Sequence, residues 1–187
     1  MSRPVILVTA FEPFGPYRVN SSWEAARLLE RRFAGRVVAA RLPVHRARAA
    51  AALDALLRDH RPEACLLTGL ARGPRLRIET VARRPRALAG PDAPGLLAGS
   101  WPVAEAGLAL RLSGLPYRVS RNAGRYVCDS TYWSLMMFRI NNGWPRDAGF
   151  LHVPPLSRRF TAARLAAGME RIVRRRLVRS AASGTAR

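Results

Sequence analysis

Two residues of this sequence have the chemistry of a thiol-dependent reaction, Cys128 and His152. Cys128 follows the segment Asn122–Val127 and opens a predicted helix that extends to about Ile140. The aligned N–H groups of a helix's first turn stabilise negative charge, so we expect this position to lower the pKa of the thiol. A cysteine nucleophile also needs a base that takes its proton and later delivers it to the leaving group.

Histidine is the natural choice for that base, and the chain contains three. His45 lies at a strand-to-helix junction and His60 ends a helix before Pro62, so both fit surface or capping roles. His152 lies at the carboxyl end of the predicted buried strand Phe150–Val153, where open α/β sheets place their sites. His152 is therefore the best candidate base, although an isolated histidine after a strand is more often structural than catalytic.

Several segments resemble the pyroglutamyl-peptidase I family of cysteine peptidases, in the family's order and at similar spacing. They are an amino-terminal signature (Val8–Gly15, Val19–Asn20 and Ser22–Ala25), a glycine loop (Gly69–Gly73), a glutamate segment (Ile78–Ala82), a nucleophile motif (Asn122–Gly124 with Tyr126–Cys128) and a histidine motif (Gly149–Pro154). The resemblance spans most of the chain to about Leu156. The amino-terminal run is the most specific part, because its register is nearly unbroken.

This resemblance implies an enzyme that removes an amino-terminal pyroglutamyl residue from peptides without a metal or other cofactor. Cys128 would be the nucleophile, and His152 would act as general base and then as general acid. Glu79 would orient the imidazole and stabilise its cation, as the third member of such triads does. Read from its neighbours alone, Glu79 is equally well a surface ion-pair partner, because arginines flank it at Arg77, Arg83 and Arg84.

The resemblance also assigns substrate contacts. Phe11 and Phe14 match aromatic positions that sandwich the flat lactam ring in the family, and Tyr126 and Val127 would add wall contacts. Without the matched run, both phenylalanines would be interpreted as core or loop anchors. Leu70 replaces a family glutamine that hydrogen-bonds the lactam, and losing such a partner changes specificity.

The chain departs from the family after Glu79. A loop that helps to shape the site is shortened, and no arginine among Arg83, Arg84 and Arg86 is assignable to support of the oxyanion. The sequence therefore leaves a second hypothesis open, a catalytically weak or inactive homologue with altered specificity or a binding role.

Charge suggests a third hypothesis. The formal net charge is +20, and all 32 basic residues are arginine. They are scattered along the chain, and no zinc-finger or RNA-binding signature accompanies them. We therefore favour solvated arginines on helix faces over specific nucleic-acid binding, while expecting adhesion to polyanions at low salt.

Apolar runs alternate with segments of helical period, which predicts an α/β fold. We expect a single three-layer α/β/α domain with a mostly parallel twisted sheet and helices on both faces. The predicted strands are 5–9, 37–42, 64–68, 76–82, 117–120 and 150–153, and the predicted helices are 22–33, 46–59, 103–112, 128–140 and 161–178. The helix at 22–33 should begin at a serine cap. No regular structure is predicted in the rest of 69–102.

We expect residues 1–179 to form the domain and 180–187 a flexible tail. No stretch has the length of a signal peptide or a membrane span. Cys65 lies in an apolar run and should be a buried, inert thiol. We therefore expect no disulfide framework, and we expect a cytoplasmic location. The expected partners are a peptide with a blocked amino terminus and further copies of this chain, without a membrane or a specific nucleic acid.

Overall fold

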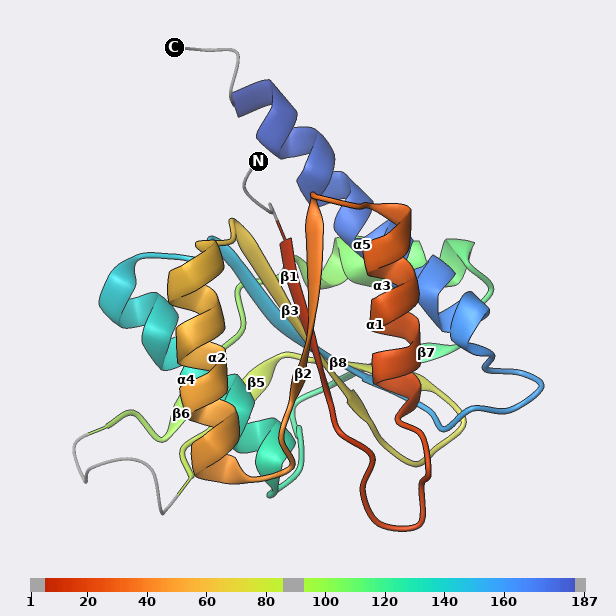
Figure 1. The fold of residues 1–187 in the computed structure, drawn as a ribbon, viewed down its shortest axis with the longest axis horizontal. Helices are drawn as coiled ribbons and strands as arrows, with labels where there is room; N and C mark the ends of the chain where they lie inside the picture. Colours follow the sequence, from red (N-terminus) through yellow and green to blue (C-terminus); the bar gives the residue numbers. More distant parts are fainter. Residues whose placement is uncertain (1–5, 86–92, 184–187) are drawn as a thin grey trace.

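A mixed six-stranded sheet forms the centre of the protein, whose computed structural model describes residues 6–85 and 93–183 (Figure 1). Its strand order is β2-β1-β3-β8-β4-β7. The strands are β1 (Ile6–Phe11), β2 (Val37–Leu42), β3 (Ala64–Leu70), β4 (Leu76–Glu79), β7 (Tyr117–Ser120) and β8 (Asp147–Val153). All neighbouring pairs run parallel except β4 and β8. The sheet is therefore mostly parallel, as the sequence predicts.

In the described part of the chain, five helices cover the two faces of this sheet (Figure 1). They are α1 (Ser21–Arg32), α2 (Arg46–His60), α3 (Val103–Leu112), α4 (Val127–Asn142) and α5 (Ala162–Ser183). Helices α1, α3 and α5 share one apolar core with the sheet, and α2 and α4 share the other. The layers are thus α/β/α. None of the described helices is both long enough and apolar enough to cross a membrane.

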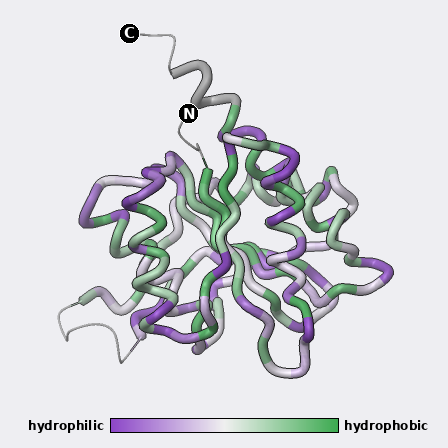
Figure 2. Tube along the Cα trace, viewed as in Figure 1, coloured by the Kyte–Doolittle hydropathy of each residue, from purple (hydrophilic) through white to green (hydrophobic). Residues whose placement is uncertain are grey.

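The buried strands are apolar on both faces, because helices cover both sides. Every residue of β1, β3 and β8 is buried. Figure 2 shows this pattern, with hydrophobic residues along the central strands and hydrophilic residues on the outer turns. Helix α5 packs one apolar stripe against the sheet, since Leu165, Met169, Ile172 and Val173 are all buried.

Side-chain caps define where the first two helices begin. The Asn20 side chain caps α1 by accepting a hydrogen bond from the Ser22 amide at 3.1 Å, so the predicted serine cap is wrong by two positions. Ser22 is buried and instead donates its hydroxyl to the same Asn20 oxygen. His45 caps α2 by accepting from the Arg48 amide at 3.3 Å, which confirms a capping role for this histidine.

The middle of the chain differs most from prediction. Residues 76–82 do not form one strand: β4 ends at Glu79, and β5 (Val81–Arg83) pairs antiparallel with β6 (Leu96–Ala98) in a separate two-stranded sheet. The glycines and prolines around 94–99 conceal β6 at the sequence level. Arg86 lies outside the described residues. At the other end of the chain, α5 continues through Ser183, beyond the predicted helix end at 178.

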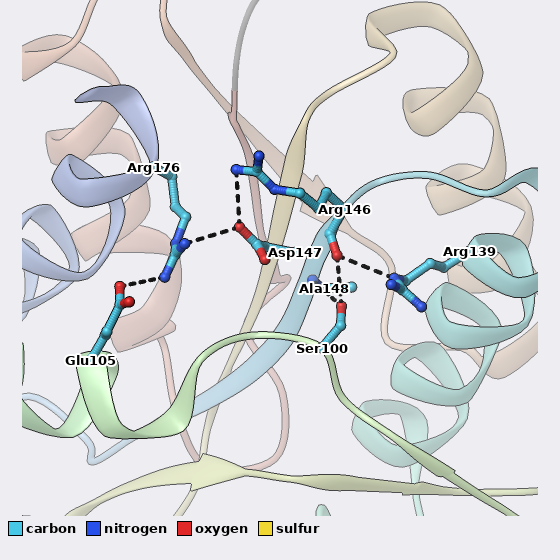
Figure 3. A network of polar contacts seen from close by, with 7 residues as sticks. All are labelled: Ser100, Glu105, Arg139, Arg146, Asp147, Ala148 and Arg176. Atoms are coloured by element: carbon cyan, nitrogen blue, oxygen red, sulfur yellow. Dashed lines mark hydrogen bonds and ion pairs between the residues drawn. The ribbon is translucent and has the colours of Figure 1, made fainter. Parts of the chain in front are cut away.

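A buried arginine ties α5 to the amino end of β8 (Figure 3). The Arg176 guanidinium is 2% exposed, pairs with Asp147 of β8 at 3.2 Å and hydrogen-bonds Glu105 of α3. It also lies 5.8 Å from the centre of the Trp101 ring. Because β8 carries His152 near its other end, this network anchors the strand on which the candidate base is placed.

Candidate active site

Three neighbouring strands bring polar side chains to one face of the sheet. In the β3–β8 ladder Gly69 lies opposite His152, and in the β4–β8 ladder Arg77 lies opposite His152 and Glu79 opposite Phe150. Residues two apart on a strand share a face. Arg77, Glu79, Phe150 and His152 therefore share the face that α4 covers, where Phe150 packs in the core with α4 side chains.

Glu79 and His152 form a buried hydrogen-bonded pair. The distance from His152 Nδ1 to Glu79 Oε1 is 2.8 Å, and the two residues are 2% and 3% exposed. Arg77 Nε lies 3.3 Å from the same carboxylate oxygen, and the Phe150 ring packs 4.6 Å from the imidazole centre. Glu79 is thus not a surface residue: it pairs with Arg77 but is buried beneath the imidazole.

Cys128 meets His152 above Gly69. A Cβ atom added to Gly69 would lie 3.1 Å from the Cys128 sulfur and 3.3 Å from His152 Cδ2. The thiol and the imidazole therefore pack against the same point of β3, where a side chain would force one of them to shift. Since Glu79 holds Nδ1, the nitrogen left for the thiol proton is Nε2, which is bonded to Cδ2.

The pair is neutral imidazole and charged carboxylate at neutral pH. Burial alone would raise the pKa of Glu79, but the hydrogen bond from His152 and the Arg77 charge outweigh it and hold that pKa below its usual range. Burial lowers the pKa of His152, and the positive Arg77 lowers it further, against the opposing effect of Glu79. His152 is therefore available as a base near neutral pH.

The prediction of a lowered thiol pKa is wrong. Cys128 is the second residue of α4, at the expected helix start, but burial raises the pKa of its thiol to about 12. The negative charges of Glu79 and Asp129 add to this effect, and Arg77 opposes it. Desolvation of the thiolate thus exceeds the benefit of the helix start, and Cys128 rests as a thiol.

The predicted substrate contacts divide into two groups. Phe11, Leu70 and Val127 are buried, and Phe11 and Val127 belong to the core cluster on the α4 side of the sheet. Phe14 is half-buried in the loop after β1, with its ring 6.1 Å from that of Tyr17. Tyr126 is exposed, and the Arg46 guanidinium lies 5.7 Å from its ring centre, so Tyr126 faces a surface hollow instead of the core.

Sequence reasoning missed two neighbours of the imidazole, Arg77 and Phe150. Arg77 lies two positions before Glu79, and Phe150 lies two positions before His152, and both pairs are in segments predicted as strands. Side chains two positions apart on a strand point to the same face, so the strand prediction already implied that each pair lies on one face of the sheet. Cys65 is fully buried with its pKa raised by burial, which confirms a structural thiol, and both cysteines are free.

Metal ligands do not gather in the described part of the chain. Within residues 6–85 and 93–183, no three histidine, cysteine, aspartate or glutamate side chains are placed to hold an ion. A thiol, an imidazole and a carboxylate lie instead at the carboxyl ends of β3 and β8. Fold and cluster together define the class: an α/β protein with the groups of a cysteine-dependent hydrolase at the ligand-binding edge of its sheet.

Comparison with known proteins identifies the family within that class. The family model described as pyroglutamyl peptidase matches residues 4–179, and the chain belongs to this family. A pyrrolidone-carboxylate peptidase of Gloeobacter violaceus is 38% identical over 168 residues, covering 81% of this chain and 82% of that protein. The Thermococcus kodakarensis protein of the same name is 34% identical over 165 residues, covering 80% of each chain.

Solved structures agree with this membership. The pyrrolidone carboxyl peptidase of Thermococcus litoralis superposes with a TM-score of 0.82 at 25% identity, covering 95% of each chain. Pyroglutamyl peptidase I of Bacillus amyloliquefaciens superposes with a TM-score of 0.78 at 23% identity, covering 89% of this chain and 93% of that one. The similarity to the Bacillus structure shows that the two proteins share the three-layer fold described above.

Proposed function

We propose that this protein is a cysteine exopeptidase that removes an amino-terminal pyroglutamyl residue from peptides through Cys128, His152 and Glu79. The observation that carries the proposal is the buried hydrogen bond between His152 Nδ1 and Glu79, with the Cys128 sulfur and the imidazole packed over Gly69. Membership of the pyroglutamyl peptidase family supplies the substrate class.

The first half of the reaction forms a thioester. His152 Nε2 takes the Cys128 proton as the sulfur attacks the carbonyl carbon of the pyroglutamyl residue. The backbone N–H groups at the start of α4 stabilise the developing oxyanion. Imidazolium is paired with ionised Glu79, and it then gives its proton to the leaving amine as the C–N bond breaks.

The second half hydrolyses the thioester. His152 accepts a proton from water, whose oxygen attacks the acyl carbon, and the sulfur leaves and regains the proton. Free pyroglutamate departs and the neutral thiol–imidazole pair is restored. Because the resting thiol has a high pKa, proton transfer accompanies attack and no stable thiolate precedes it.

We assign lactam recognition to Phe11, Phe14, Leu70, Tyr126 and Val127. Leu70 is buried at the end of β3 and offers no side-chain hydrogen bond to a lactam. Selection for pyroglutamate is therefore expected to be weaker than a polar residue at this position would allow.

Hydrolysis of a chromogenic pyroglutamyl amide tests the proposal. The wild type should release the chromophore, and Cys128→Ala should abolish release while leaving the far-UV circular dichroism unchanged. Cys65→Ala is the matched control and should retain turnover, because that thiol is fully buried in the core between the sheet and helices α2 and α4. Failure of the wild type to cleave any pyroglutamyl or related acyl amide contradicts the proposal.

A non-catalytic homologue is the second candidate, favoured by the raised pKa of Cys128 and by Leu70. It retains the fold as a binding module. With a pyroglutamyl peptide present, both candidates should protect Cys128 from alkylation by iodoacetamide, so turnover separates them: an enzyme hydrolyses the peptide, whereas a binding module protects the thiol and leaves the peptide intact.

We further propose a cytoplasmic location, since a thiol nucleophile and two free cysteines suit a reducing compartment. A peptide with a blocked amino terminus is the proposed partner, together with further copies of this chain. Specific nucleic-acid or membrane partners are not part of the proposal.

A further inference from the structure

A cationic hollow of about 460 Å³ adjoins the start of α4, the helix that carries Cys128. Arg46, Arg83, Arg84 and Arg125 line it, together with Asp129 and neighbouring residues. Arg125 precedes Cys128 by three positions and Asp129 follows it directly. The hollow therefore adjoins the start of α4, where the proposed reaction takes place.

Positive charge exceeds negative charge in this hollow. Without counting Arg84, three guanidinium groups face one carboxylate, that of Asp129, among the described lining residues. Asp129 is already engaged, since its Oδ1 accepts a hydrogen bond from the Arg83 amide at 3.0 Å. Concave, positively charged walls of this kind concentrate anions.

Backbone contacts hold two of these arginines in place, and a carbonyl partner leaves the charge of a guanidinium intact. Arg46 donates to the carbonyl of Arg125 at 2.7 Å, and Arg83 donates to the carbonyl of Arg121 at 3.5 Å. Tyr126, the cap residue of α4, makes no side-chain capping hydrogen bond. The first-turn N–H groups of α4 thus add positive potential on the same side.

We propose that this hollow binds a carboxylate on the leaving-group side of the substrate, an inference that rests on the proposed peptidase function. Guanidinium groups bind carboxylates in bidentate geometry. Each extended residue advances about 3.3 Å, so a carboxylate on the first or second residue after the scissile bond can reach a hollow at the first turn of α4. The preferred substrates are short acidic pyroglutamyl peptides.

Two pairs of matched substrates test the inference and separate the two sources of carboxylate. Pyroglutamyl-alanine is compared with its amide for the terminal carboxylate. Pyroglutamyl-glutamate amide is compared with pyroglutamyl-glutamine amide for the side-chain carboxylate. At low salt, kcat/KM of the acidic member of at least one pair should exceed that of its neutral partner about fivefold, and the ratio should decline at 0.5 M NaCl.

The variant Arg83→Gln/Arg125→Gln should reduce that ratio to about one or two. The readout is the ratio of kcat/KM for two substrates measured on one enzyme preparation. Partial unfolding of the variant lowers both values equally and does not change their ratio. Arg111→Gln/Arg118→Gln is the control, because it removes the same charge from exposed positions outside the hollow and should keep the wild-type ratio.

The outcomes distinguish the two proposals. Cleavage of the neutral chromogenic amide with ratios of about one for both pairs overturns the carboxylate subsite and leaves the peptidase function intact. A wild-type preference that the hollow variant keeps, or that the control variant loses equally, also overturns the subsite. Absence of cleavage of every substrate overturns the peptidase function and the subsite with it.

Discussion

At the scale of single residues, the Glu79 carboxylate is shared by a base and a cation. His152 Nδ1 and Arg77 Nε both approach Glu79 Oε1, at 2.8 and 3.3 Å. The Arg77 charge favours ionised Glu79 and disfavours protonated His152, so it keeps the imidazole ready to accept a proton. We therefore regard Arg77 as a positioning residue that acts through Glu79.

Replacing Arg77 with methionine should move the acid limb of the kcat/KM profile to higher pH. Without the positive charge the His152 pKa rises, so the base is already protonated at a pH where the wild type is active. The measurement is the pH dependence of kcat/KM with the chromogenic amide from pH 5 to 8.

Arg77→Lys is the conservative variant and should restore most of the wild-type profile, because it keeps the charge. Arg75→Met removes an exposed arginine two residues away and should leave the profile unchanged. Identical acid limbs for Arg77→Met and the wild type contradict the assigned role.

At the scale of elements, the register of β3 against β8 decides how closely the thiol and imidazole can approach. Gly69 lies opposite His152, and a methyl group there would also lie 3.1 Å from the Phe150 ring. Such contacts are tighter than ordinary van der Waals distances, so a side chain at this position must displace the nucleophile, the base or both.

Gly69→Ala should lower kcat at least tenfold and destabilise the fold by about 1–3 kcal/mol. Steady-state kinetics and urea unfolding measure the two effects. Gly95→Ala is a matched control, because its added methyl group meets nothing within 4 Å. Full activity of Gly69→Ala would show that the sulfur and imidazole are not held against β3.

The Arg176 network makes a second prediction about elements. Arg176→Met should lower the free energy of unfolding by about 3 kcal/mol, because it removes the 3.2 Å partner of the buried Asp147 carboxylate and leaves the longer 3.5 Å contact with the exposed Arg146. The expected decrease in Tm is about 6–12 °C. Urea and thermal unfolding provide the measurement.

Arg174→Met is the control for that prediction. Its guanidinium is exposed and pairs with Glu170 on the same helix, so the loss should stay below about 1 kcal/mol. In Arg176→Met/Asp147→Leu both buried charges are gone, and much of the lost stability should return. Equal effects of the Arg174 and Arg176 replacements would show that burial of the second pair contributes nothing.

At the scale of the whole molecule, the buried site makes stability depend on pH. The pKa of His152 is lowered on folding, so the unfolded chain binds a proton that the folded protein resists. The free energy of unfolding is therefore greatest above the unfolded value of about 6.5 and falls as pH drops below it. The lowered pKa of Glu79 acts in the same direction at more acidic pH.

Urea unfolding between pH 7.5 and 5.5 should show this decline in the wild type and a weaker one in His152→Gln. His60→Gln replaces the histidine at the end of α2, outside the site, and should retain the wild-type slope. A His152→Gln slope equal to that of the wild type would exclude the buried imidazole as its source.

Local patterns in the sequence predict most of the elements. The segments 37–42, 103–112 and 117–120 coincide with β2, α3 and β7. Hydrophobic period and turn residues act over a few positions, so they identify such elements and place Cys128 at a helix start and His152 near a strand end. They fail at β6, where glycine and proline obscure a short strand that exists only because β5 pairs with it.

By itself, therefore, the sequence determined the α/β class, the thiol and the imidazole, and through its resemblance the family. The tertiary structure decided their chemical state. Antiparallel pairing of β4 with β8 puts Glu79 and Arg77 beside His152, and burial of the Cys128 thiol at the start of α4 raises its pKa. Strand register and desolvation depend on residues distant in the chain, so they cannot be predicted from the spacing of neighbouring residues.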